Sequence, residues 1–129
     1  MIVKFPYLLK GTSYFPILRL TVKHNSEAID TDALVDSGAS ISVFQSAVAK
    51  FFGINVLNGE EIFLQTINGK TKAYLHEFPI IFGDSKFKCK IAFSEELATS
   101  FNILGRDNFF RFFKITFDEL GKELILEQN

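Results

Sequence analysis

The sequence has one cysteine, no tryptophan and no long apolar run. With Cys89 alone the chain cannot form an internal disulfide, which fits a reducing compartment. No stretch approaches the roughly 18 apolar residues that a membrane span requires. Lys4 and Pro6 interrupt the apolar N-terminus, which is atypical of a signal peptide. We therefore expect a cytoplasmic protein with no membrane partner.

The chain also lacks an excess of positive charge. Lysine and arginine total 14 residues against 15 aspartates and glutamates, for a net charge of -1. Proteins that bind nucleic acids use basic side chains to neutralise phosphates. We therefore expect no nucleic-acid partner.

Phenylalanine is abundant, with 16 of the 129 residues. Its side chain is apolar and carries no polar group, so it suits a dense core, an oligomer interface or an apolar pocket. The aromatic cluster at residues 109–113 should be divided between core and interface. The length predicts one domain over residues 1–129.

Two segments alternate apolar and polar residues, as half-buried strands do. Their apolar positions are Leu18, Leu20 and Val22 in the first segment, and Phe87, Cys89, Ile91 and Phe93 in the second. A return strand over residues 28–35 should follow the first segment. The second segment has lysines at positions 86, 88 and 90. We interpret them as a solvated face that discourages edge pairing, a substrate-facing basic stripe being the alternative.

Two further hairpins and two short helices are predicted. The dipeptide Asn68-Gly69 favours a tight turn between strands at residues 60–67 and 71–82, and a turn containing Gly121 should join residues 115–117 to 124–126. A helix over residues 42–52 is expected from the capping pair Ser42 and Gln45 and the stop at Gly53. A shorter helix is expected at residues 106–112. The fold class is therefore mostly β.

The most informative chemistry lies in residues 33–40. An apolar strand leads into Asp36, then into the hydroxyl of Ser37 and then Gly38. A carboxylate at the end of a buried strand is costly unless something uses or satisfies it. Gly38 allows a sharp turn and a close approach to another group. On this tripeptide alone, an ordinary turn before a helix is the simpler interpretation.

The order of elements along the whole chain favours a catalytic interpretation. Asp36-Ser37-Gly38-Ala39 precedes a helix, the Asn68-Gly69 hairpin and the segment Ile103-Leu104-Gly105-Arg106-Asp107. This order resembles the retropepsin-like aspartic proteases, small single-domain relatives of the retroviral proteases, over roughly residues 15–126. The resemblance implies a small closed β-barrel with a flap hairpin and one or two short helices, acting as a homodimeric aspartic endopeptidase.

The resemblance also implies a role for each matched residue. Asp36 corresponds to the catalytic carboxylate, and Ser37 to the hydroxyl that braces the two active-site loops. Gly38 would permit their close approach, and Ala39 would line the floor beside the substrate backbone. The flap tip would be Thr66, Ile67, Asn68 and Gly69, and the support beneath the loop would be Ile103, Leu104, Gly105 and Arg106.

A homodimer is expected because this chemistry needs two carboxyl groups that share one proton. Only Asp36 stands in an Asp-Ser-Gly or Asp-Thr-Gly sequence, so the second group must come from another copy across a two-fold axis. The pair would activate water against an extended peptide or protein substrate beneath two flaps. No cofactor and no metal are expected. His24 and His76 lie far apart, with no ligand at metal spacing.

Some positions depart from the family pattern. Ser40 and Ile41 stand where retroviral members usually have an acid, so Arg106 lacks its obvious partner, leaving Asp107 and Asp32 as candidates. Lysines at positions 70 and 72 flank the flap tip in place of glycines. The family further suggests that residues 1–14 and 127–129 pair at the dimer interface.

Two other functions stay open. One is a retropepsin-like peptide-binding or dimerisation module with little or no turnover, although binding alone does not need the acid at Asp36. The other is an unrelated β-barrel for an apolar ligand, with Asp36 on a surface turn. Cys89 should be a buried thiol and not a nucleophile, and Ser37 has no histidine base in recognisable register.

Overall fold

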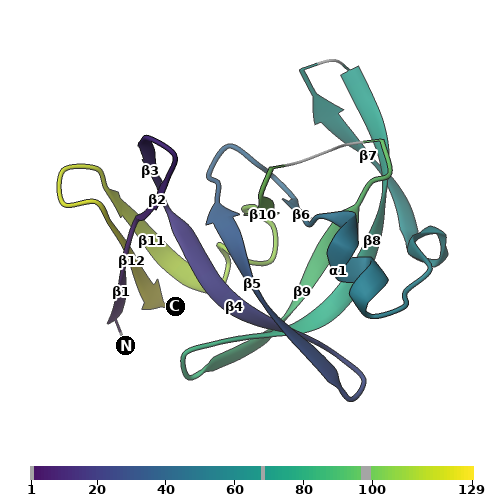
Figure 1. Ribbon diagram of the computed structural model, residues 1–129, viewed down its shortest axis with the longest axis horizontal. Coiled ribbons are helices and arrows are strands. Elements are labelled where there is room, and N and C mark those ends of the chain that lie inside the picture. Colours follow the sequence, from purple (N-terminus) through teal and green to yellow (C-terminus); the bar gives the residue numbers. More distant parts are fainter. Residues whose placement is uncertain (1, 68, 97–99) are drawn as a thin grey trace.

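A computed structural model describes residues 2–67, 69–96 and 100–129, and most of them lie in β-strands (Figure 1). The strands are β1 (Ile2–Pro6), β2 (Leu8–Lys10), β3 (Ser13–Phe15), β4 (Ile17–His24), β5 (Glu27–Val35), β6 (Ser42–Val43), β7 (Glu60–Thr66), β8 (Gly69–Phe82), β9 (Ser85–Phe93), β10 (Asn102–Leu104), β11 (Phe113–Asp118) and β12 (Glu123–Gln128). The helical elements are α1 (Ser46–Phe51) and the 3-10 turn η1 (Val56–Asn58). In the described part of the chain, no helix has the length and apolar character needed to cross a membrane.

Six strands close into a barrel. The main sheet has the order β4-β5-β10-β6-β9-β8-β7, and a further pairing of β4 with β8 joins its two sides. Thr21 lies opposite Ile81 in that closing pair, and Val22 opposite Ile80. Strand β7 is the edge strand beside β8 and rises from the barrel as half of a long hairpin (Figure 1). The predicted mostly-β closed barrel is thus confirmed.

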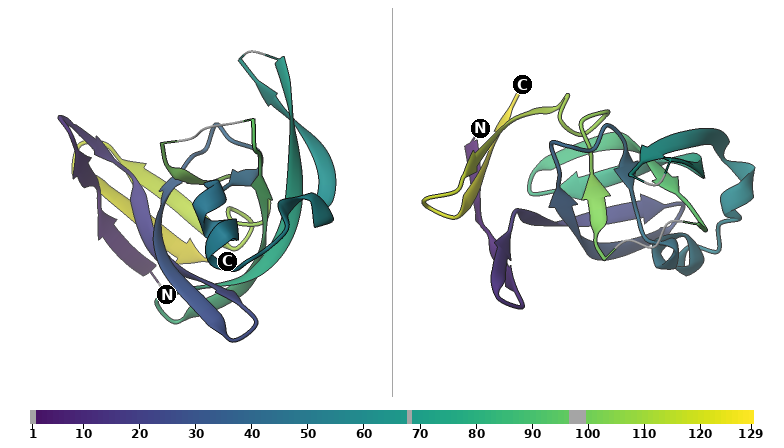
Figure 2. Two further views of the ribbon diagram at one scale, coloured as in Figure 1. Left: turned by 45° about the vertical axis from the view of Figure 1, so that its right-hand side comes forward. Right: turned by 90° about the horizontal axis from the view of Figure 1, so that it is seen from above.

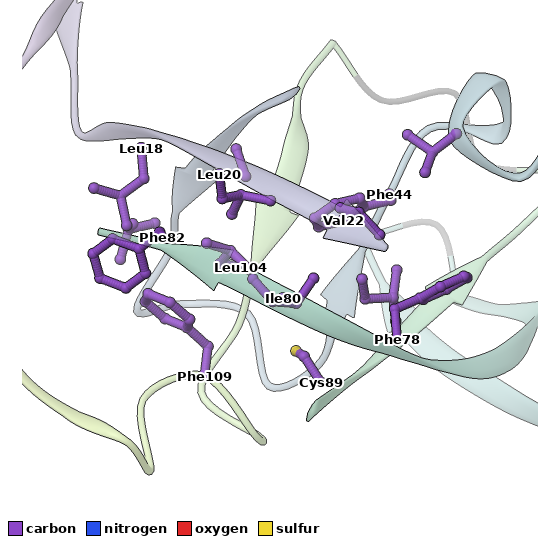
Figure 3. Packing of buried hydrophobic residues seen from close by; sticks show 14 of the residues in the cluster. Leu18, Leu20, Val22, Phe44, Phe78, Ile80, Phe82, Cys89, Leu104 and Phe109 are labelled. Atoms are coloured by element: carbon purple, nitrogen blue, oxygen red, sulfur yellow. The ribbon is translucent and has the colours of Figure 1, made fainter. Parts of the chain in front are cut away.

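The predicted alternation sets which side chains enter the barrel. Leu18, Leu20 and Val22 of β4 are buried while Arg19 is exposed. In β9, Cys89 and Ile91 are buried, and all three lysines of the strand are exposed. Figure 3 shows the β4 side chains meeting those of β8 in the same interior. Burial of one face of each strand supplies the main stabilising term of the fold.

The aromatic cluster at residues 109–113 extends this core. Phe109 and Phe113 are buried, and their ring centroids lie 6.3 Å and 5.1 Å from that of Phe82. Phe112 is 36% exposed. The core half of the prediction is confirmed, whereas an interface role for Phe112 stays a prediction.

Both chain ends join one small sheet of order β1-β12-β11. Ile2 of β1 lies opposite Glu127 of β12, so the terminal segments pair within the chain. Tyr7 follows β1 and donates a 2.7 Å hydrogen bond to the Glu119 carboxylate. Burial and this contact raise the pKa of Tyr7 to about 12. Strands β2 and β3 form a separate two-stranded ribbon that projects from the barrel (Figure 2).

Both helix predictions need correction. Ser42 begins strand β6 and not a helix, and α1 starts at Ser46 after Gln45, whose side chain makes no capping hydrogen bond. The predicted stop at Gly53 holds, with φ at +67°. Residues 106–112 form successive turns in place of a helix. Asn108 has φ at +71°, a left-handed conformation that a helix does not continue through.

Candidate active site

Asp36 directly follows the last residue of β5. Its amide nitrogen donates a 3.0 Å hydrogen bond to the carbonyl oxygen of Leu104 in β10. Strand β10 runs parallel to β5, with Leu104 beside Val35 and Ile103 beside Leu34. Leu104 is fully buried and Ile103 partly so. The two chain segments predicted to form the site are therefore adjacent, and β10 supports the strand that carries Asp36.

The residues after Asp36 fold back toward its carboxyl group. The amide of Gly38 donates a 2.9 Å hydrogen bond to Oδ1 of Asp36, and the amide of Ala39 donates to its carbonyl oxygen at 3.2 Å. A Cβ atom on Gly38 would lie 3.2 Å from Oδ1, so a larger residue would crowd the carboxyl group. Ser37 is exposed beside it. These contacts fix the orientation of a solvent-accessible carboxyl group.

Gly105 and Arg106 hold the far end of this loop. The amide of Arg106 donates to the carbonyl oxygen of Ala39 at 2.9 Å, and that of Asp107 donates to Ser40 at 2.7 Å. Gly105 lies against the backbone of Ile41, where a Cβ atom would come within 2.6 Å. Such an approach is possible only for glycine. Residues 39–41 therefore run alongside residues 105–107.

Two buried polar residues, Ser42 and Asn102, brace the site and were missed as such by the sequence analysis. The hydroxyl of Ser42 accepts a 3.0 Å hydrogen bond from the amide of Gly105. The side chain of Asn102 accepts from the Gln45 amide at 2.7 Å and donates to the Thr31 hydroxyl at 2.8 Å. A polar residue inside the apolar run 101–104 was the available signal for Asn102. For Ser42 the local pattern indicated a helix cap instead.

The hairpin of β7 and β8 contains the residues predicted to form the flap, and we call it the flap below. Thr66 lies opposite Gly69, and its hydroxyl donates a 2.9 Å hydrogen bond to the Gly69 carbonyl. Ile67 at the tip is fully exposed. Asn68, also predicted at the tip, lies outside the described residues. On β8, Lys70 and Lys72 are exposed.

A cavity of about 320 Å³ separates the flap from the loop that follows Asp36. It is lined by Gly38, Ala39, Ser40, Ile41 and Val43 from below and by Phe63, Leu64, Gln65 and Thr66 of the flap. Of the predicted residues, Gly38, Ala39 and Thr66 line this cavity, whereas Asp36, Ser37, Ile67 and Gly69 do not. Asp36 adjoins the cavity through its hydrogen bond with the Gly38 amide. Two larger cavities, of about 540 and 530 Å³, lack the residues next to Asp36.

The two candidate partners of Arg106 do not pair with it. Asp32 forms an ion pair with Arg19, with 3.2 Å between Oδ1 and Nε. Arg106 is exposed and, among the residues described, forms no ion pair. Its contact with the site is through its backbone amide.

The other titratable candidates lie apart from this cavity. Cys89 is fully buried, as predicted, and burial raises its pKa to about 11, which keeps the thiol protonated at neutral pH. His76 contacts the carbonyl oxygen of Val56 at 2.8 Å, and the His24 ring packs near Phe52. In the ranges that the structure covers, no group of three or more potential metal ligands gathers.

Comparison with known proteins agrees with this architecture. Residues 20–111 match the family model described as "gag-polyprotein putative aspartyl protease". No curated protein matches the sequence significantly. A retropepsin-like aspartic protease from Rickettsia conorii shares the fold, with a TM-score of 0.72, 20% identity and coverage of 98% of this chain and 91% of that one.

A viral enzyme has the same fold with lower structural similarity and sequence identity. EIAV protease in complex with the inhibitor HBY-793 gives a TM-score of 0.57 at 16% identity, covering 78% of this chain and 89% of that one. The family match spans most of the barrel and includes both Asp36 and Gly105. The chain therefore belongs to the gag-polyprotein aspartyl protease family, whose members are retropepsin-like aspartic proteases.

Proposed function

We propose that this protein is an aspartic endopeptidase, active as a homodimer with Asp36 from each subunit. One observation carries the proposal: the Asp36 carboxyl group is oriented by the Gly38 amide beside a cavity roofed by a flap. An ordinary surface turn would need neither the bracing strand β10 nor the close approach of Gly105. The family of the chain supports the same reaction class.

The reaction uses two carboxyl groups that share one proton, because like charges a few ångströms apart cannot both ionise cheaply. The ionised group takes a proton from water while the water oxygen bonds to the peptide carbonyl carbon. The protonated group gives its proton to the carbonyl oxygen. Breakdown of this tetrahedral intermediate, with protonation of the nitrogen, then breaks the C–N bond.

The need for a second subunit follows from the single Asp-Ser-Gly sequence at residues 36–38. Two identical loops meeting on a two-fold axis would supply both carboxyl groups through one self-complementary contact. Ser37 is exposed beside Asp36, so its hydroxyl is free to reach the opposite loop. Catalysis would then depend on protein concentration.

The substrate that fits this site is an extended peptide or protein segment. Such a segment would lie between the flap and residues 38–41 and form strand-like hydrogen bonds, while its side chains alternate into pockets. Ile41, Val43, Phe63 and Leu64 give the cavity apolar walls. We therefore propose a preference for an apolar side chain at this subsite.

The test is cleavage of a peptide library by the wild-type dimer across pH, compared with Asp36→Asn. We expect activity favoured in acid, inhibition by statine-type transition-state mimics and no cleavage by the variant. Asp84→Asn is the matched control, because Asp84 lies in the exposed turn between β8 and β9. Full cleavage by Asp36→Asn would refute the proposal. A verified wild-type dimer that binds peptides without cleaving them would favour the binding-module alternative.

A further inference from the structure

Among the residues that the structure describes, no third strand pairs with the β2–β3 ribbon. Its register places Leu8 opposite Phe15, Leu9 opposite Tyr14 and Lys10 opposite Ser13. Every residue of β2 is exposed, and in β3 only Phe15 is partly buried. An isolated two-stranded hairpin is marginally stable in water. The ribbon therefore needs a surface to pack on.

The two faces of the ribbon differ. Successive side chains of a strand point to opposite faces, so Leu8 and Phe15 share one face and Leu9 and Tyr14 share the other. The first face contacts the barrel, with the rings of Phe15 and Phe101 5.2 Å apart. On the second face, Leu9 is 56% exposed and Tyr14 is 52% exposed. This Leu9–Tyr14 face is apolar and is uncovered in the described chain.

The ribbon is attached beside Asp36. Phe15 is followed by Pro16, whose carbonyl oxygen accepts a 2.9 Å hydrogen bond from the amide of Val35. Val35 is the residue before Asp36. The segment that ends the ribbon is therefore hydrogen-bonded to the neighbour of Asp36. Figure 1 shows the ribbon on the side of the barrel where β5 ends. Two copies that bring their Asp36 residues together therefore also bring their ribbons close to the contact.

The terminal sheet offers a second copy no free edge at its central strand. Strand β12 lies between β1 and β11 of its own chain, so both of its edges are already hydrogen-bonded. A second copy cannot add a strand to β12 without displacing one of these neighbours. The uncovered ribbon requires no such exchange.

We propose that the Leu9–Tyr14 face of the ribbon packs against a second copy of this chain and thereby stabilises the dimer. This inference rests on the proposed function, because it is the pairing of Asp36 that brings two copies together at this end of the barrel. Tyrosine is among the residues that contribute most often to interface affinity. The ribbon thereby makes formation of the active site depend on residues outside the loop and the flap.

The experiment is sedimentation equilibrium of the full chain, comparing wild type with Leu9→Lys and with Tyr14→Lys. Leu57→Lys is the matched control, because Leu57 is also a 56% exposed leucine but lies in η1. We expect each ribbon variant to raise the dimer dissociation constant by about tenfold or more, and the control to leave it unchanged. Circular dichroism verifies that each variant is folded, as expected for substitutions at exposed positions.

Two results would overturn the inference. One is a wild-type chain that stays monomeric with and without a transition-state mimic. The other is unchanged association of both ribbon variants, and a raised KM in that case would place substrate on the ribbon instead. Because association is measured without catalysis, a dimer weakened by Leu9→Lys would support the ribbon contact even if the wild-type protein cleaved no peptide. The experiment therefore distinguishes failure of the proposed proteolysis from failure of the proposed ribbon contact.

Discussion

The backbones of Gly105 and Ile41 are in direct contact: a Cβ atom on Gly105 would lie 2.6 Å from the carbonyl carbon of Ile41 and 2.7 Å from its oxygen. This contact joins the segment after β10 to the loop that follows Asp36. The hydrogen bond from the Arg106 amide to the Ala39 carbonyl lies beside it. The absence of a side chain at position 105 therefore sets how closely the loop that follows Asp36 approaches β10.

Gly105→Ala should displace this loop. The added methyl group meets backbone atoms that cannot rotate away, so we expect the free energy of unfolding to fall by about 1–3 kcal/mol and cleavage to decrease. Urea denaturation and peptide cleavage measure the two effects. In the control Gly121→Ala, the atoms nearest the new Cβ atom belong to the Asp118 side chain, which can rotate away, and not to the backbone. Equal effects of the two variants on cleavage would contradict the explanation.

Asn102→Ala should be among the more destabilising single substitutions. It removes two part-buried hydrogen bonds, with the backbone amide of Gln45 and the hydroxyl of Thr31, and truncates a side chain that is itself buried. Because each such hydrogen bond contributes about 0.5–1.5 kcal/mol, we expect a loss of about 1–3 kcal/mol in the free energy of unfolding, measured by urea denaturation. Asn58→Ala, at an exposed asparagine of η1, serves as the control. A cost near that of the control would mean that water replaces the lost contacts.

Phe63→Ser should weaken the binding of substrates with an apolar side chain at the flap subsite. Phe63 lines the cavity although its side chain is 58% exposed. Removing apolar contact in such a pocket should raise KM by about tenfold for those substrates and less for polar ones. Steady-state kinetics on matched peptides measures the difference. Phe51→Ser, at a phenylalanine 48% exposed in α1, should leave both KM values unchanged.

Cys89 should make the protein less stable in alkali. Burial raises its pKa from 9.0 to about 11, so between these values the unfolded chain releases the thiol proton while the folded chain keeps it. The contribution of the protonated thiol to the free energy of unfolding is fully present below pH 9.0. It is lost as pH rises toward 11, by up to roughly 1.4 kcal/mol per pH unit. Urea denaturation at several pH values should show a shallower decline for Cys89→Ala. Parallel declines in the two proteins would exclude the thiol as the cause.

The strands and the loop at Asp36 were predictable because their signals are local. Alternation at Leu18, Leu20 and Val22 specifies a half-buried strand whatever surrounds it. The Asn68-Gly69 dipeptide likewise favours a tight turn, and the last residue of β7, Thr66, lies opposite the first residue of β8, Gly69. Asp36-Ser37-Gly38 could be recognised because the acid, hydroxyl and glycine are contiguous.

Ser42 shows why other features could not be predicted. Its spacing from Gln45 is a local helix-capping pattern, yet its hydroxyl accepts a hydrogen bond from Gly105, 63 residues away. The strand pairing of β6 with β10 and β9 outweighs the local preference. The helix predicted at residues 106–112 failed in a similar way, because the Asp107 amide is held by Ser40 and Asn108 turns left-handed.

The sequence by itself determined the strand pattern, the family and the position of the Asp-Ser-Gly motif, since each depends on residues that are neighbours in the chain or recur at a fixed spacing. Only the tertiary structure decided that Asn102 and Ser42 brace the site, that flap and loop enclose a cavity, and that the β2–β3 ribbon has an uncovered face. These features depend on contacts between distant segments. Their geometry is fixed only when the closed barrel brings those segments together. Polar groups that become buried there are stable only when they are hydrogen-bonded.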